Sequence, residues 1–153
     1  MTEKTINRYR QAVEPLLGPG EALLDVAKVV PVAGVGALGA DPVPFGSALA
    51  RIGAVAGGGG STAAAFPTGT ALGKAGLLTV TDRRVAFVEA GPDLRKPGRL
   101  LWTAPRARVA RAERRPRTQA MARFRLHFAD GSSVAMMTMR RRTIESLAVH
   151  LGR

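Results

Sequence analysis

The chain contains no cysteine, which excludes disulfide bridges and thiolate metal sites. Histidine occurs only at His127 and His150, so a metal site built from several imidazoles is not expected. The longest uncharged stretches are broken by glycine and proline, which argues against a membrane-spanning helix. The opening residues, MTEKTINRYR, lack the apolar core of a secretory signal. We therefore expect a cytoplasmic protein that needs no metal or other cofactor.

Acidic residues are scarce in the second half of the chain. Residues 73–153 hold 18 basic and 6 acidic side chains, whereas residues 1–72 hold five of each, so the net charge of +12 belongs to the second half. Such asymmetry is typical of proteins that bind nucleic acid or an anionic lipid surface. Arginine outnumbers lysine 19 to 4, however, and a GC-rich genome produces that excess through codon usage alone. Both explanations remain open at this point.

The length of 153 residues suits one domain with a real core. Residues 1–19 are predicted to form a short N-terminal helix, with one apolar stripe of residues at helical spacing. The stripe consists of Ile6, Tyr9, Val13 and Leu16. Residues 20–153 form the rest of the domain, and they begin with ALLDVAKVV at 22–30, which is typical of a strand.

Residues 31–73 differ in composition, because eleven of the 43 are glycine. A connection this long is unusual inside a compact domain. Phe45, Leu49, Ile52 and Ala56 follow helical spacing and could form one ordered face. We favour the alternative, in which the insertion is a flexible or loosely docked loop.

The stretch LLTVTDRRVAFV at 77–88 has two apolar runs on either side of three charged residues, Asp82, Arg83 and Arg84, which we call the charged knot. A two-residue turn at Asp82 and Arg83 gathers the larger apolar groups on one face. That turn predicts the pairs Val80–Val85, Leu78–Phe87, Thr79–Ala86 and Leu77–Val88. The charged knot is therefore interpreted as the tip of a hairpin rather than as a binding site.

Four further strands are predicted at 99–104, 108–115, 122–128 and 133–139, with a bulge after Val109. In ARFRLHF, strict alternation turns the apolar residues inward and the residues Arg123, Arg125 and His127 outward. Asp130-Gly131 is a strong hairpin signal. Turns of two or four residues here both match the Phe124 face to Ala135 and Met137.

The chain ends in a predicted amphipathic helix at 142–151, with Thr143 as its N-cap. Its apolar stripe comprises Ile144, Leu147, Ala148 and Leu151. Seven strands that curl on themselves leave an apolar end, and such a helix can cover it.

This order of elements resembles the pleckstrin-homology-like (PH-like) barrel, and LLTVTDRRVAFV resembles the corresponding hairpin of bacterial PH-like and GRAM-type proteins. The resemblance covers about residues 20–152, interrupted by 31–73. It implies a mainly β (α+β) fold, an antiparallel β-barrel of about seven strands with a C-terminal capping helix. It also implies binding of lipid, peptide or protein rather than catalysis. In lipid-binding members the first strand ends in a basic residue, a role that Lys28 could fill, but the second strand here has no basic residue.

Two motifs associated with other chemistry do not match their patterns in full, and the two histidines lack visible partners. GVGALG at 34–39 matches a dinucleotide-binding pattern, but the prolines of ADPVPFG follow where a helix is required. GTALGKA at 69–75 has the wrong spacing for a phosphate loop, and Ala75 replaces the magnesium ligand. Neither His127 nor His150 has an acid–base partner visible in the sequence. An enzyme is therefore not expected.

The arginines of the last third form the one candidate binding constellation. Guanidinium groups suit carboxylates and phosphates. If the strands pair as neighbours, Arg111 and Arg114 could lie near Arg123 and Arg125 and form a cationic strip. We predict a non-catalytic binding or scaffolding module with a protein partner, and with charge-driven attraction to anionic membrane surfaces as a second option. The alternative is a basic protein that binds the phosphate backbone of nucleic acid through an arginine-rich sheet face. The candidate residues are Arg108, Arg111, Arg114, Arg115, Arg117, Arg123 and Arg125.

Overall fold

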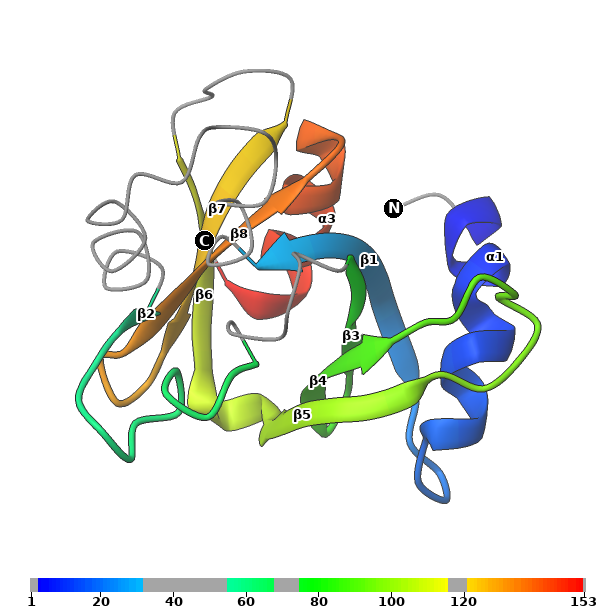
Figure 1. Cartoon of the computed structure of the whole chain (residues 1–153), viewed down its shortest axis with the longest axis horizontal. Coiled ribbons are helices and arrows are strands. Elements are labelled where there is room, and N and C mark those ends of the chain that lie inside the picture. The colour runs from blue at the N-terminus through cyan, green and yellow to red at the C-terminus, as the bar shows by residue number, and fades with distance from the viewer. Residues whose placement is uncertain (1–2, 32–54, 68–74, 116–120, 153) are drawn as a thin grey trace.

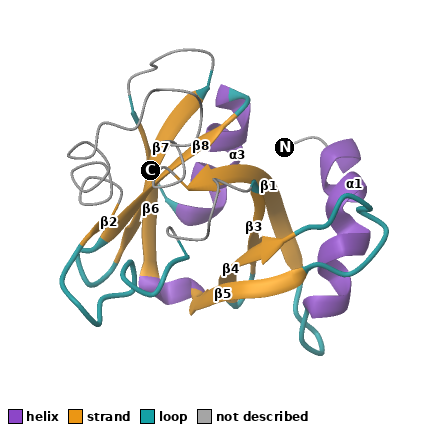
Figure 2. Ribbon diagram, viewed as in Figure 1, coloured by secondary structure: helices purple, strands orange, loops and turns teal. Residues whose placement is uncertain are grey.

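The computed structural model describes residues 3–31, 55–67, 75–115 and 121–152 (Figure 1). Within these ranges, two α-helices pack on a set of strands, and short 3-10 turns connect α1 to β1 and β5 to β6 (Figure 2). In chain order the elements are α1 (Glu3–Val13), η1 (Glu14–Leu16), β1 (Leu23–Pro31), β2 (Val55–Ala56), β3 (Gly76–Thr81), β4 (Arg84–Glu89), β5 (Arg99–Pro105), η3 (Arg106–Arg108), β6 (Val109–Arg114), β7 (Ala122–Phe128), β8 (Ser133–Thr138) and α3 (Arg141–Leu151).

All strand pairs are antiparallel, and the strands follow the order β5-β4-β3-β1-β8-β7-β6, with β2 added beside β8. The predicted mainly β fold with a short N-terminal and a C-terminal helix is thus confirmed. Closure into a barrel is not seen, because no pairing among the described residues joins β5 to β6. The sheet therefore has two ends, at β5 and at β6.

Strand β1 joins the two halves of the sheet. Its first part pairs with β3 from Leu23 to Val29, and its last residues, Val30 and Pro31, pair with β8. The sheet curls around this long strand, so β6, β7 and β8 face β3, β4 and β5 across the core (Figure 1). Helix α3 packs against β6 and β1 and covers the interior.

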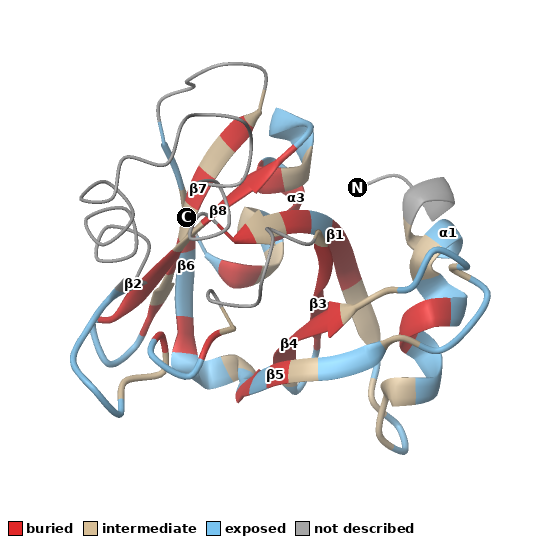
Figure 3. Ribbon diagram, viewed as in Figure 1, coloured by how far each residue is buried: buried red, intermediate tan, exposed pale blue. Residues whose placement is uncertain are grey.

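The main core lies between the two halves of the sheet and α3. Buried residues alternate along β7, where Phe124, Leu126 and Phe128 point inward as predicted (Figure 3). From α3, the predicted stripe contributes Ile144, Leu147 and Leu151, which are fully buried, while Ala148 is half-buried.

A second apolar cluster lies on the opposite side of β1, beneath α1 (Figure 1). Ala12 and Val13 of α1 pack on Val26, Leu77 and Val88 of three adjacent strands. The other stripe residues of the predicted N-terminal helix are partly buried against the same cluster. Because helix α1 covers one face and the core covers the other, β3 is buried along its whole length.

The hairpin at 77–88 has the predicted register. β3 and β4 pair Val80 with Val85 and Leu78 with Phe87, and only Asp82 and Arg83 separate the two strands. The predicted bulge near Val109 is also present in the β6–β7 pair.

The predicted partners across the β7–β8 hairpin are wrong. Phe124 pairs with Met136, whereas Ala135 lies opposite Arg125 and Met137 opposite Arg123. The connection is a three-residue turn, in which the Phe128 amide donates to the Ser132 carbonyl at 2.9 Å. Gly131 at φ 79° supplies the left-handed residue that such a turn needs. A change of one residue in turn length moves every partner to the other face of the strand.

Part of the insertion at 31–73 docks onto the fold. Most of its proposed helical face lies outside the described residues, but Ala56 belongs to β2, which pairs with β8, so a helix extending to Ala56 is wrong. Further along, Phe66 is buried with its ring centroid 5.0 Å from that of Phe87 and 4.9 Å from that of Trp102. The described part of the insertion therefore supplies a core residue.

The start of α3 also differs from the prediction. The N-cap position is Arg140, with no side-chain cap, and Thr143 lies within the first turn, donating its amide to the Arg140 carbonyl at 3.1 Å. Buried Ser146 instead anchors the helix, because its Oγ donates to Oδ2 of buried Asp25 in β1 at 2.7 Å. Within the ranges that the structure describes, neither helix has the length and apolar character needed to cross a bilayer.

Candidate functional site

The outward side of β6 and β7 gathers charged side chains into one surface. The register places Arg111 opposite His127 and Glu113 opposite Arg125, and paired residues of antiparallel strands share a face. The Arg115 amide donates to the Arg123 carbonyl at 2.9 Å, which continues the same register. We call this surface the basic face, and it consists of Arg111, Glu113, Arg115, Arg123, Arg125 and His127.

Core packing determines which side chains reach this face. Ala112, Leu126 and Phe124 are buried, so their neighbours along each strand must turn outward. The basic face is therefore built on two rigid, paired strands whose opposite side belongs to the main core.

Glu113 lies at the centre of the cations of the basic face. Its Oε2 atom lies 2.6 Å from Nε2 of His127, 3.5 Å from Nη2 of Arg111 and 3.6 Å from Nη2 of Arg115. The hydrogen bond with His127 is the main cause that lowers the pKa of Glu113, and the charges of Arg115 and Arg111 add to it against an opposing effect of burial. His127 thus has a carboxylate partner that sequence reasoning missed.

The arginines of β7 contact β8 or lie against the sheet. Nη1 of Arg125 donates to Oγ of Ser133 at 3.0 Å. Nε of Arg123 is buried and makes no hydrogen bond within the described part of the chain. A buried donor without an acceptor costs about 1–3 kcal/mol, so Arg123 has hydrogen-bonding capacity that the described residues do not use.

The remaining predicted residues lie around the basic face rather than on it. Arg108 ends η3, and its carbonyl accepts the Ala129 amide at 2.8 Å beside the β7–β8 turn. Arg114 is exposed at the end of β6, but its partner is Phe124, so the register turns it toward the core side of the sheet. Its predicted place beside Arg123 and Arg125 is therefore taken by Arg115. Arg117 lies outside the described residues.

The basic face is extended rather than compact. Strands rise by about 3.3 Å per residue, so the backbones of Arg111 and Arg115 are separated by about 13 Å along the strand direction. The side chains of Arg111 and Arg115 are 49% and 48% exposed and so remain accessible to a partner. Glu113 is the sole acidic residue in the described stretches 108–115 and 121–128.

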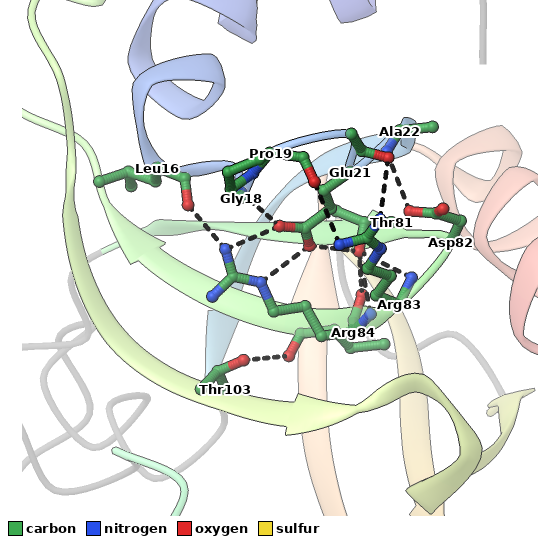
Figure 4. A network of polar contacts seen from close by, with 12 residues as sticks. Leu16, Gly18, Pro19, Glu21, Ala22, Thr81, Asp82, Arg83, Arg84 and Thr103 are labelled. Atoms are coloured by element: carbon green, nitrogen blue, oxygen red, sulfur yellow. Dashed lines mark hydrogen bonds and ion pairs between the residues drawn. The ribbon is translucent and has the colours of Figure 1, made fainter.

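The charged knot of the β3–β4 turn, by contrast, is used inside the fold (Figure 4). Nε and Nη2 of Arg84 donate to the two carboxylate oxygens of Glu21 at 2.8 and 3.0 Å, and Nη2 also donates to the Leu16 carbonyl at 2.6 Å. Glu21 further accepts from Oγ1 of Thr81 at 2.7 Å and from the Gly18 amide at 2.7 Å. These bonds lower the pKa of Glu21 from 4.5 to about 2, with the Arg84 hydrogen bond as the largest cause.

The other two residues of the turn complete this connection. Arg83 donates to the carbonyls of Pro19 and Gly20, at 3.1 and 3.3 Å, and Oδ1 of Asp82 accepts the Ala22 amide at 2.9 Å. The turn therefore holds the segment between α1 and β1 in place. Its arginines are structural, as the sequence interpretation expected of a hairpin tip.

No arrangement typical of metal binding occurs in the described ranges, where no three His, Asp or Glu side chains gather at a common point. The glycine-rich motifs at 34–39 and 69–74 lie outside those ranges. The histidine–carboxylate pair of His127 with Glu113 is flanked by Arg111 and Arg115, an arrangement suited to binding anions.

Comparisons with known proteins add no relative: no family model, curated protein or solved structure matches the chain. The basic face must therefore be interpreted from its own geometry and charge.

Proposed function

We propose that the chain is a non-catalytic binding module of PH-like type that engages a protein partner through the basic face. The observation that carries the proposal is the concentration of guanidinium groups on the outer side of β6 and β7, with Glu113 as the single acid among them. Arginine forks recognise carboxylates in bidentate geometry, and a rigid sheet keeps them in place at little entropic cost. The strand order and the C-terminal helix against the core support the PH-like assignment.

The shape of the basic face favours an extended acidic segment of a protein. Its cations follow the direction of β6 over about 13 Å, which an extended chain of about four residues spans. A single lipid headgroup reaches only a few of them. Attraction to an anionic membrane surface nevertheless remains the second option, because it needs charge alone.

Nucleic acid is the alternative partner, and the burial of the aromatic residues argues against binding of single strands. Proteins that bind single strands stack bases on exposed aromatic rings. Here Trp102 and the described phenylalanines are buried, and Tyr9 lies on α1 against the second apolar cluster. A duplex, which is bound through phosphate contacts, remains a distinguishable competitor.

The hypothesis of a protein partner also predicts an exposed sheet edge or apolar groove. β5 ends the sheet, and Leu100 on it is 39% exposed, so an edge of this kind is available. The exposed Met139 lies between β8 and α3, and the exposed Val149 lies on α3. The basic face remains the better-supported docking surface because it combines accessible charge with a rigid base. A cytoplasmic location, expected from the sequence, stays a prediction.

The test compares two double variants with the same loss of charge. R111Q/R115Q removes two cations from the basic face, and R140Q/R141Q removes two exposed cations at the start of α3. Binding of a labelled ten-residue glutamate-rich peptide is measured by fluorescence anisotropy at low salt, alongside duplex DNA and phosphatidylserine vesicles.

We expect the chain to bind the peptide, and R111Q/R115Q to weaken binding about tenfold or more, with a much smaller loss for R140Q/R141Q. Equal losses in the two variants would show attraction by net charge alone. Binding of DNA or vesicles, but not of the peptide, would favour nucleic acid or an anionic membrane surface over a protein as the partner. Unchanged thermal unfolding of both variants is the control for folding.

A further inference from the structure

The basic face already contains one bound oxyanion, which belongs to the chain itself. The Glu113 carboxylate contacts His127, Arg111 and Arg115 through a single oxygen, Oε2. It lies on β6 like Arg111, and Arg115 directly follows this strand, so Glu113 takes the alternate position between the two arginines. Its place demonstrates that these three basic side chains converge on a carboxylate-sized acceptor.

We infer that Glu113 is a resident counter-ion of the basic face, and that a polyacidic segment of a partner protein binds by taking over the cations that Glu113 now holds. The inference rests on the proposed function and specifies how the same surface selects its partner. No covalent bond changes in this exchange. One carboxylate replaces another, and the Glu113 carboxylate, which is about one third exposed, is left in contact with water.

The exchange explains which ligands the face accepts. Replacing the Glu113 carboxylate by one external carboxylate gains almost no electrostatic energy, since the same contacts are broken and formed. A ligand must therefore bring further acidic groups that reach cations beyond Glu113. A segment with several carboxylates is selected over a single acidic side chain, and the advantage grows with the number linked together.

Two arginines of β7 supply those further contacts. Arg125 lies opposite Glu113 in the register, and Arg123 lies opposite Arg115. Because Nε of Arg123 has no acceptor within the described residues, turning this group toward an incoming carboxylate breaks no hydrogen bond to any of them at that atom. Arg125 would exchange its 3.0 Å bond to Ser133 for a charge-assisted one.

The decisive variant is Glu113→Gln, with Glu145→Gln as the matched control. Both changes remove one negative charge and keep the side-chain shape, but Glu145 is exposed on α3, away from the basic face. Affinity for the ten-residue glutamate-rich peptide is measured at 50 mM and 500 mM salt, and a peptide with two glutamates serves as the short probe.

We expect E113Q to bind the long peptide about three- to tenfold more tightly than the unmodified chain at low salt, and E145Q to change affinity less than twofold. The gain should shrink at high salt, because screening weakens exposed charge interactions. In the unmodified chain, saturating peptide should move the His127 imidazole NMR signals toward their positions in E113Q.

Two results would overturn the inference: equal affinities of E113Q and E145Q, or His127 signals that stay in place when the peptide binds. Either leaves the proposed function standing if R111Q/R115Q still loses binding, so the two failures are distinguishable. If E113Q fails to fold, Glu113→Thr provides the same loss of charge with a residue that strands favour.

Discussion

The most demanding stability prediction concerns Glu21, whose side chain is only 3% exposed and pairs with Arg84 beneath the β3–β4 turn. Glu21→Gln preserves the shape but removes the charge that two guanidinium nitrogens, Thr81 and the Gly18 amide all contact. Breaking a buried ion pair by removing one partner costs about 3–5 kcal/mol. Arg84 is 24% exposed and can regain water, so we expect a smaller loss of about 2–3 kcal/mol.

The dependence of this loss on pH provides a sharper test than its size. The pKa of Glu21 is about 2 in the folded chain, against an ordinary value of 4.5. A carboxyl group with a depressed folded pKa stabilises the fold fully above its unfolded pKa, and this contribution is lost as pH falls toward the folded pKa. The difference between the unmodified chain and E21Q should therefore be complete at pH 6 and shrink progressively from pH 4.5 to pH 2.

Urea unfolding at pH 6 and pH 3, followed by the fluorescence of the single tryptophan Trp102, measures both quantities. Glu14→Gln is the control, because Glu14 forms an exposed ion pair with Arg10 at 3.5 Å that contributes less than about 0.5 kcal/mol. A cost of E21Q no greater than that of E14Q, or a cost that is the same at both pH values, would contradict a stabilising role of the Glu21 charge. An E21Q/R84Q double-mutant cycle should show strong coupling between the two changes.

Three further changes probe the packing of the core and its helix, each measured by urea unfolding. Phe66→Ala should cost about 3–5 kcal/mol, because it removes a buried ring from the aromatic cluster, and a loss below about 1 kcal/mol would contradict core packing of the insertion. Gly76→Ala should be clearly destabilising, since its Cβ would clash with the Phe87 ring of β4, whereas Gly91→Ala, with no atom within 4 Å, should be nearly neutral; equal effects would be inconsistent with this packing. Ser146→Ala should cost about 1–3 kcal/mol by depriving buried Asp25 of a donor, and an unchanged midpoint would argue against this anchor of α3.

Local patterns predicted much of the fold. The alternation in ARFRLHF identified the inward face of β7, and the apolar stripe of the C-terminal helix identified the side of α3 that is buried. The register of the β3–β4 hairpin also followed from its own sequence, because the turn and the strands it joins are adjacent in the chain. In each case the determining interactions lie within a few residues.

The candidate site was predicted only in part. Alternation placed Arg123 and Arg125 on the outer face of β7, and the assumption of neighbouring strands brought Arg111 beside them. The bulge after Val109 changes the alternation along β6. The sequence did not define the position of this bulge closely enough to show that Arg115, rather than Arg114, shares that face. The pairing of His127 with Glu113 depends on the same register and was missed with it.

The sequence by itself determined the order and type of the two helices and of every described strand except β2, since hydrophobic periodicity and turn residues act locally. Contacts between distant segments were decided by the tertiary structure alone, because they depend on how strands align in space. Phe66 enters the core from a glycine-rich insertion whose composition gave no such signal. Arg84 donates a hydrogen bond to Glu21, which lies 63 positions earlier in the sequence. The charged knot of LLTVTDRRVAFV thereby supports the segment that precedes β1.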